Sequence, residues 1–330
     1  MTIEGALQVA MVGATREPGA RWNAGALIAD LRDARPQVLV LTGDYVARSD
    51  VAEWNALHER WDRVADGVVA LPGAGERRGD RRLAAHSAAF AGQGVPELRG
   101  VPFWHFDVVT EGVRWRFVML DADARSLGPT WRDQLFWLPK VVTGNSYDRL
   151  VVAINGPTNS LVGGLRVDAS ESVQSLLRVI GEHADPARLS LVVSGGAVSN
   201  SVVLPQGAYG PVHVLAGNAG LEGVPLNRVS LSPSGERTAS IEPTFAAALD
   251  LELEHWTGAL GPVGAPELEA MPWDPEVMSI AGWWGVEIVG YEVSLTFRVR
   301  CRDGSLHDLY RLVFTRSRGW TPESIQTSDP

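Results

Sequence analysis

The chain has 330 residues, of which 45% are hydrophobic and 21% are charged, with 35 glycines and 20 prolines. This composition is typical of a folded globular protein and excludes the disordered and collagen-like classes. The formal net charge of −10 argues against nucleic acid as a partner, because proteins that bind a phosphate backbone cluster lysine and arginine on their surface.

Two further features concern the compartment. The N-terminal sequence MTIEGALQVAMVG lacks the basic flank and the long apolar run of a signal peptide, and no stretch approaches about 18 uninterrupted apolar residues. The only cysteine, Cys301, excludes an intramolecular disulfide and lies in a strand-like run, where we expect a buried thiol. We therefore expect a cytoplasmic protein without membrane insertion.

Between residues 7 and 216, short apolar runs alternate with amphipathic stretches, a pattern typical of strand and helix units around a sheet covered on both faces. The predicted strands are Leu7 to Val12, Val38 to Leu41, Val68 to Leu71, Trp115 to Leu120, Leu150 to Ile154, Leu189 to Val193 and Val212 to Leu215. One helix is predicted to begin near Asp50 and a second to follow Ala169, because apolar residues recur there at helical spacing.

The last third of the chain has a different pattern. Residues 258–284 are rich in glycine, proline, glutamate and tryptophan, which predicts a loop or insertion. Apolar residues then alternate with polar ones from Val293 to Val299, which predicts a strand with one buried face. Asp303 and Gly304 supply a hairpin turn, after which the chain returns from Leu306 to Phe314.

Several short motifs follow one another in a defined order: VGATR, PQVLVLTGDYV, LPGAGERRGD, VRWRFVMLDAD, QLFWLPK, VVAINGP, VVSGGAVSN and VHVLAGNAG. Their order and spacing resemble those of the calcineurin-like metallophosphoesterases. The resemblance implies an α/β fold in which two mixed β-sheets pack face to face and are flanked by helices. We expect residues 1–316 to form this domain, with the insertion near 258–284 and a C-terminal tail at 317–330.

The resemblance does not extend to the metal ligands. Members of that family use Asp, Asn and His side chains at strand ends to hold two metal ions that activate a hydroxide. The resemblance places the ligand positions at Ala14, Arg16, Asp44, Ala74, Gly75, Asn155, Gly196 and Val198 of this chain. Glycine, alanine and valine have no donor atom, and an arginine would place a cation at the site. The seven histidines form no short metal-binding motif either, so we expect neither metal nor cofactor.

Asp44 is the one ligand that the resemblance retains, as the residue that would bridge two metals in an active relative. The alternative is that Asp44 accepts backbone hydrogen bonds in the turn after its strand. Without partner ligands, we favour the structural role.

A polar cluster is predicted where the strands end. Because α/β sheets place ligands at the carboxyl ends of their strands, these side chains could together bind a small anionic ligand without metal. The cluster contains Arg16, Asp44, Arg77, Arg78, Asn155, Asn159, Ser199 and Asn200. The alternative, which we favour, is that Arg77 and Arg78 face solvent and pair with Glu76, Asp80 or nothing.

The function predicted from these observations is that of a pseudoenzyme, a catalytically inactive metallophosphoesterase-like protein that acts as a binding, structural or regulatory subunit. A metal-independent enzyme whose cleft is rebuilt around Asp44, Arg16, Arg77 and Asn155 is the alternative, with Asp44, Arg16 and Asn155 as its catalytic candidates. A residual phosphoesterase with a single metal at Asp44 is less favoured, because one carboxylate is far from a full coordination shell.

A protein partner or self-association follows from this hypothesis. Tryptophan and arginine anchor many protein interfaces, so the insertion with Trp273, Trp283 and Trp284 is the first candidate surface and the cleft is the second. Core packing of these tryptophans against the last sheet is the alternative, which we favour for the tryptophans themselves.

Overall fold

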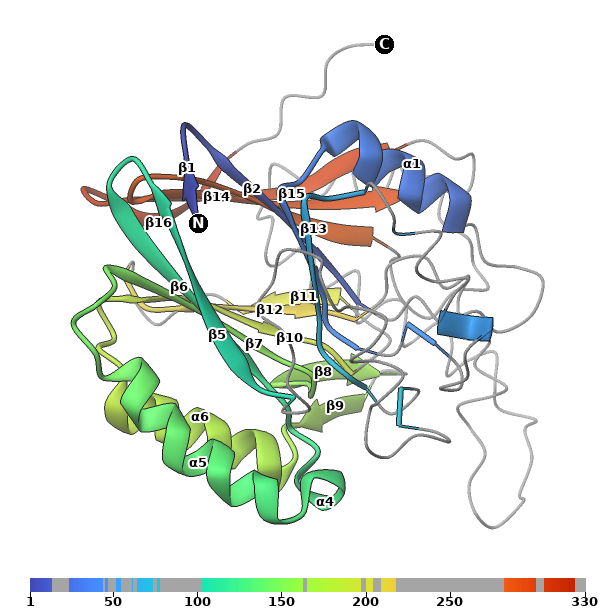
Figure 1. Ribbon diagram of the computed structural model, residues 1–330. Coiled ribbons are helices and arrows are strands. Elements are labelled where there is room, and N and C mark those ends of the chain that lie inside the picture. Colours follow the sequence, from blue (N-terminus) through green and yellow to red (C-terminus); the bar gives the residue numbers. More distant parts are fainter. Residues whose placement is uncertain are drawn as a thin grey trace.

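A computed structural model shows the arrangement of the chain (Figure 1). The structure describes residues 1–13, 24–43, 45–46, 52–54, 61, 64–73, 76–77, 102–162, 165–196, 200–203, 209–217, 282–300 and 306–323. The helix predicted near Asp50 lies largely outside these residues, although Trp54, Trp61 and Val64 on its predicted apolar face are buried.

Within the described residues, the first sheet has seven strands, and its four central strands run parallel, as expected for apolar runs buried on both faces. In spatial order they are β1 (Thr2–Ile3), β5 (Trp104–Thr110), β6 (Val113–Leu120), β7 (Arg149–Ile154), β10 (Leu189–Ser194), β12 (Val212–Ala216) and β11 (Asn200–Val203). Both β5 and β11 are antiparallel to their inner neighbours, so the sheet is mixed. A separate two-stranded ribbon contains β8 (Asn159–Val162) and β9 (Leu165–Asp168).

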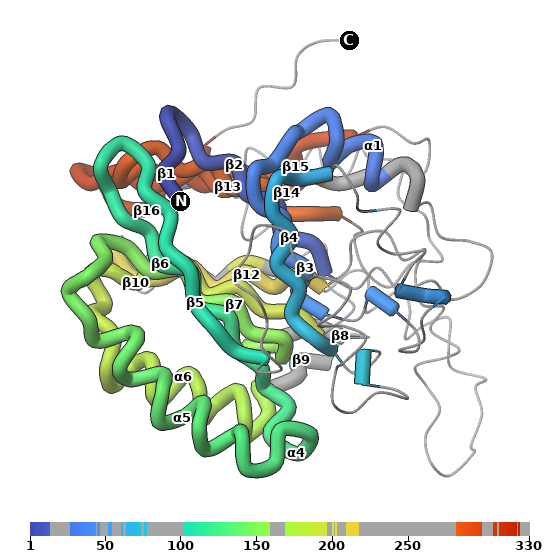
Figure 2. Tube along the Cα trace, viewed as in Figure 1, coloured from blue at the N-terminus to red at the C-terminus, as the bar shows by residue number. Residues whose placement is uncertain are grey.

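The second sheet, in the part of the chain that the structure describes, also has seven strands, which come from both the N-terminal and the C-terminal regions. Its order is β16 (Gly319–Glu323), β15 (Leu306–Thr315), β14 (Glu292–Arg300), β13 (Gly282–Val289), β2 (Leu7–Val12), β3 (Val38–Leu41) and β4 (Gly67–Ala70). The N-terminal strand β2 pairs antiparallel with β13, and the blue and red segments lie side by side in Figure 2. All seven strands predicted between residues 7 and 216 are confirmed, with boundaries within two residues.

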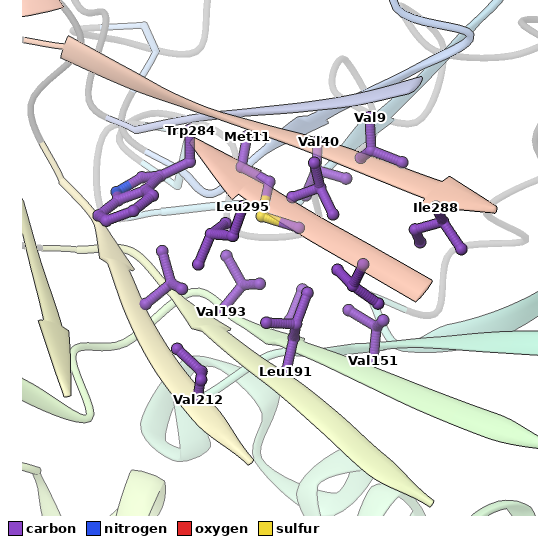
Figure 3. Packing of buried hydrophobic residues seen from close by; sticks show 14 of the residues in the cluster. Val9, Met11, Val40, Val151, Leu191, Val193, Val212, Trp284, Ile288 and Leu295 are labelled. Carbon is purple, nitrogen blue, oxygen red and sulfur yellow. The ribbon is translucent and has the colours of Figure 1, made fainter. Parts of the chain in front are cut away.

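One apolar core lies between the two sheets. The alternation in β14 turns Val293, Leu295 and Phe297 inward, where each is at most 1% exposed. Residues such as Val151 and Leu191 meet them from the first sheet (Figure 3). Period-two alternation thus supplies one buried face, and the opposite sheet covers it.

Helices cover the outer face of each sheet. α1 (Ala24–Ala34) packs on β2, β3 and β4 through Leu27, Ile28 and Leu31. α4 (Ala124–Leu127), α5 (Pro129–Val142) and α6 (Glu171–His183) lie on the side of the first sheet (Figure 1), where α5 and α6 pack on β6, β7 and β10. The helix predicted after Ala169 is confirmed as α6, and the Ser170 hydroxyl caps it by accepting from the Val173 N–H. The predicted fold of two mixed sheets flanked by helices is therefore confirmed.

The C-terminal region corrects one prediction and confirms another. The tail predicted for residues 317–330 contains β16, which pairs with β15 and places the Trp320 ring centroid 5.3 Å from that of Phe314. Trp283 and Trp284 belong to β13 and are 3% and 0% exposed, so the favoured interpretation that they pack in the core is confirmed, and they are not interface anchors. Residues 258–281 of the insertion, Cys301 and the Asp303–Gly304 turn lie outside the described residues. Within the described ranges, no helix has the length and apolar character needed to cross a membrane.

His213, on β12, is expected to make the stability of the protein depend on pH. Its neighbours Val212 and Val214 face the shared core, so the His213 side chain lies on the opposite face of the strand, and burial lowers its pKa from 6.5. The unfolded chain then binds protons more readily than the folded one, so stability is complete above pH 6.5 and falls as the pH drops below it.

We expect His213→Gln to reduce this loss of stability, which is at most about 1.4 kcal/mol per pH unit for one group. Urea unfolding of both proteins between pH 5 and pH 8 measures it. The difference in the free energy of unfolding between the two proteins at pH 8 gives the packing cost of the substitution. If the two free energies change in parallel from pH 8 down to pH 5, the prediction is wrong.

Candidate functional site

The carboxyl ends of strands from both sheets meet at one end of the sandwich. Thr42 follows β3, and its hydroxyl donates to the Ala216 carbonyl oxygen at the end of β12, at 2.8 Å. Two glycines allow the backbones to approach this closely. A Cβ on Gly13 would lie 2.0 Å from the Ala216 carbonyl oxygen, and one on Gly195 would lie 2.2 Å from that of Thr42. The glycines at these strand ends therefore allow the two sheets to touch through main-chain atoms.

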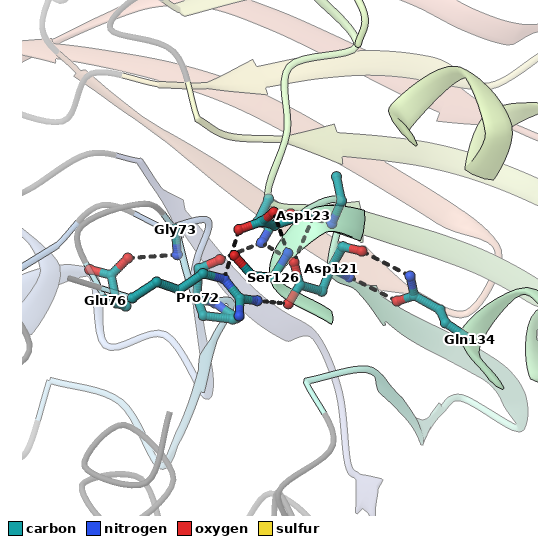
Figure 4. Close-up of polar contacts among 10 residues, drawn as sticks. Pro72, Gly73, Glu76, Asp121, Asp123, Ser126 and Gln134 are labelled. Atoms are coloured by element: carbon teal, nitrogen blue, oxygen red, sulfur yellow. Dashed lines mark hydrogen bonds and ion pairs between the residues drawn. The ribbon is translucent and has the colours of Figure 1, made fainter. Parts of the chain in front are cut away.

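A buried ion pair joins the two sheets beside this contact (Figure 4). Asp121, which follows β6 of the first sheet, is fully buried and pairs with Arg77 from the loop after β4 of the second sheet. Arg77 Nε also lies 3.3 Å from the partly exposed carboxylate of Asp123. Burial raises the pKa of Asp121, and the Arg77 charge acts in the opposite direction. Arg77 thus provides the positive charge that a buried carboxylate requires.

Asn155, directly after β7, uses its whole amide group in the same network. Its Oδ1 accepts from the Ala122 N–H at 2.6 Å. Its Nδ2 donates to Asp121 Oδ1 at 2.8 Å and to the Pro72 carbonyl oxygen. Asn155 therefore holds the β4 and β6 loops together.

Glu76 fastens two loops of the second sheet. It is fully buried, and its Oε1 accepts from the backbone N–H groups of Tyr45 and Val46, both at 2.9 Å. Its Oε2 accepts from the Gly73 N–H at 2.6 Å. One carboxylate thus joins the loop after β3 to the loop after β4.

We expect Glu76→Gln to lower the free energy of unfolding by about 2–3 kcal/mol. Glutamine has only one acceptor oxygen, so its NH2 group would face a backbone N–H whichever way the amide is turned. Chemical denaturation measures the change. Glu292→Gln on the exposed surface is the control and should shift stability by less than about 0.5 kcal/mol. Equal effects of the two variants would show that the carboxylate does not fasten the loops.

These groups do not fit the pair of metal ions that the sequence resemblance implies for active relatives. Gly196 occupies one histidine position with φ +77°, and a Cβ there would lie 2.7 Å from the Asn155 carbonyl oxygen. Asn155 Oδ1 accepts a backbone hydrogen bond, and a guanidinium cation lies beside Asp121. In the part of the chain that the structure describes, no three Asp, Glu, His or Cys residues group as a metal site would require.

The structure brings together only part of the predicted polar cluster. Arg77 and Asn155 both contact Asp121, and the interpretation that Arg77 faces solvent is wrong, because this residue is 8% exposed. Asn200 is buried on β11, where its Oδ1 accepts from the Gly217 N–H at 3.2 Å. Arg16, Asp44, Arg78 and Ser199 lie outside the described residues, and so does the Asn159 side chain.

Asp121 is a central residue of this network that the sequence interpretation did not single out. Its only signal was its place after the apolar strand in VRWRFVMLDAD, where the resemblance implies a strand ending in Leu-Asp. A carboxylate directly after a buried strand needs a cation or several donors, and sequence spacing alone does not identify Arg77, 44 residues earlier, as its partner.

Comparison with known proteins concerns the fold alone. No model of a protein family matches the chain, and no curated protein matches its sequence. Among solved structures, PhoD superposes with a TM-score of 0.56 at 11% identity, covering 98% of this chain and 72% of its own. A dimetal phosphatase from Danio rerio has a TM-score of 0.49 at 12% identity, with 89% and 96% covered. Vps29 from Entamoeba histolytica, in a mutant form, has a TM-score of 0.39 at 10% identity, with 93% and 99% covered.

The likeness to PhoD spans both sheets and the helices that flank them, because it covers almost the whole chain. The order of the motifs and the topology therefore agree: this chain has the fold of the calcineurin-like metallophosphoesterases.

Proposed function

We propose that this chain is a pseudoenzyme of the metallophosphoesterase fold, which works in the cytoplasm by binding a protein partner or a second copy of itself. The observation that carries the proposal is the state of the polar side chains where the strands end. Arg77, Asp121 and Asn155 are buried and bonded to one another and to the surrounding backbone.

A ligand that used these groups would first have to break their internal bonds. Asp121 Oδ2 accepts a hydrogen bond from Arg77. Asp121 Oδ1 accepts hydrogen bonds from Asn155 Nδ2 and from the Asp123 N–H. The cost of leaving a buried polar group unpaired is about 1–3 kcal/mol, and it is higher for a charge. The network therefore acts as structure in place of a metal centre, which leaves the outer surface of the fold for a partner.

The same observation argues against the metal-independent enzyme. A general acid or base needs a free position facing its substrate, and Arg77 and Asn155 of the proposed cleft are engaged within the protein. Asp44 and Arg16 lie outside the described residues, so their part in that alternative stays a prediction.

The first test addresses catalysis. The purified full chain, incubated with manganese, iron or zinc and then desalted, should retain less than stoichiometric metal by mass spectrometry. It should also fail to hydrolyse bis(4-nitrophenyl) phosphate or 4-nitrophenyl phosphate above the buffer rate. Two metal ions per chain, or turnover that an Asp121→Asn variant abolishes, would overturn the proposal.

The second test addresses binding, for which the insertion remains the first candidate surface. We expect Glu267→Lys and Glu269→Lys combined with Trp273→Ala to weaken self-association, measured by sedimentation of the full chain, without lowering the melting temperature. The matched control combines Glu111→Lys, in the turn between β5 and β6, with Glu292→Lys, at the start of β14, and both residues are exposed. An unchanged sedimentation profile would remove the insertion as the interface.

A further inference from the structure

At the other end of the sandwich, an arginine is buried beside aromatic rings. Arg149 is the first residue of β7, so it lies at the opposite end of this strand from Asn155. It pairs in register with Trp115, whose ring belongs to the core between the sheets. Its guanidinium carbon lies 4.4 Å from the ring centroid of Phe314 and 5.7 Å from that of Trp115. Arg149 therefore projects between the two sheets, and it is only 7% exposed.

Arg116, on the neighbouring strand β6, is equally buried and has hydrogen-bond partners for its guanidinium group. Its Nη1 donates to the Val141 carbonyl oxygen at 3.1 Å. Its Nε and Nη2 donate to the two carboxylate oxygens of Asp107, each at 2.8 Å. This is the side-on bidentate geometry in which guanidinium groups bind carboxylates and phosphates.

Arg149 also donates to a backbone carbonyl oxygen, but within the described residues it has no bidentate pair with a carboxylate. Its Nη1 donates to the Ala187 carbonyl oxygen at 2.9 Å. Its Nε is buried and has no hydrogen-bond partner, and no carboxylate within the described ranges forms an ion pair with it. The Nε and Nη2 edge, which binds Asp107 in Arg116, therefore has no partner in Arg149 among the described residues.

Arg316 is a second cation at this end of the sandwich. Arg316 follows β15, two residues after Phe314, and its guanidinium carbon lies 3.8 Å from the ring centroid of Tyr291 in the turn between β13 and β14. Burial lowers the pKa of Arg149 to about 10; Tyr291 acts against this shift, and the positive charge of Arg316 contributes to it. The stacked rings offset part of the cost of burying this charge, but they supply no hydrogen-bond acceptor.

We propose that this end of the sandwich binds an oxyanion, a carboxylate or a phosphate group, on the Nε and Nη2 edge of Arg149, with Arg316 as the second positive charge. The anion would complete the hydrogen bonding of a buried guanidinium and relieve the repulsion between two cations. The site is independent of the network at Asp121, which lies at the other ends of the strands.

Inorganic phosphate and acetate serve as probes, titrated at constant ionic strength with chloride as the balancing ion. Nε–H signals of arginine are followed by 15N–1H NMR, and Arg149→Lys identifies the signal of Arg149. We expect this signal to move with saturation in phosphate or acetate and to remain in place in chloride. Movement with phosphate alone assigns a phosphate site, and movement with acetate assigns a carboxylate site.

A matched pair of variants separates a site from general screening. Arg316→Gln should weaken the binding of the active probe about fivefold, whereas Arg318→Gln, an exposed arginine two residues further on, should leave it within about twofold. If no arginine signal responds to either probe, or if both variants weaken binding equally, the proposal is wrong. Because neither variant removes a buried side chain, this comparison does not depend on the stability of Arg149→Lys.

Discussion

Replacing Asp121 by alanine should lower the free energy of unfolding by about 3–5 kcal/mol. The substitution leaves the Arg77 cation buried between the β4 and β6 loops, and among the described residues the partly exposed Asp123 carboxylate, 3.3 Å from Arg77 Nε, is its remaining ion-pair partner. It also removes one of the two acceptors of the Asn155 side-chain NH2 group and the acceptor of the Asp123 backbone N–H. Urea unfolding followed by tryptophan fluorescence measures the change.

Two further variants identify the cause of this loss. Asp123→Ala removes the exposed partner of Arg77 and the N-cap of α4, where its carboxylate accepts from the Ser126 N–H at 3.0 Å, and should cost about 1–2 kcal/mol, less than Asp121→Ala. The double variant Arg77→Met with Asp121→Leu removes both charges and should recover a large part of the stability lost in Asp121→Ala, because no unpaired charge remains buried. If Asp121→Ala cost no more than Asp123→Ala, the ion pair would not be what joins the two sheets.

Replacing Gly195 by alanine should destabilise the protein by about 3 kcal/mol. The added Cβ would lie 2.2 Å from the Thr42 carbonyl oxygen and 2.5 Å from its hydroxyl oxygen, so the ends of β3 and β10 would have to separate. Separation would also weaken the hydrogen bond from Thr42 to Ala216 that links the two sheets. Thermal and chemical unfolding report the loss.

Gly181 provides the matched control, because it lies within α6 and a Cβ there would meet nothing within 4 Å. Gly181→Ala should stabilise the protein by about 0.5–1 kcal/mol through the higher helix propensity of alanine. Equal effects of the two substitutions would show that the strand ends at Gly195 do not approach as closely as the structure indicates.

The central strands and the second helix could be predicted from the sequence alone. Apolar runs such as Leu150–Ile154 are shorter than a typical helix and contain no polar residue, which indicates a buried strand. In β7 these residues are buried. The alternation in β14 and the helical spacing in α6 likewise follow from which side chains must leave water. The motif order added the packing of two sheets, because it resembles that of a known family.

Which polar side chains meet, and what covers each tryptophan, depends on the tertiary structure. Arg77 pairs with Asp121 because the loops after β4 and β6, which belong to different sheets, lie against each other. Trp283 and Trp284 are buried on opposite faces of β13 because α1 covers one face and the first sheet covers the other. Local sequence patterns indicate whether a side chain is buried. The residue that pairs with a buried charged side chain depends instead on contacts between residues far apart in the chain.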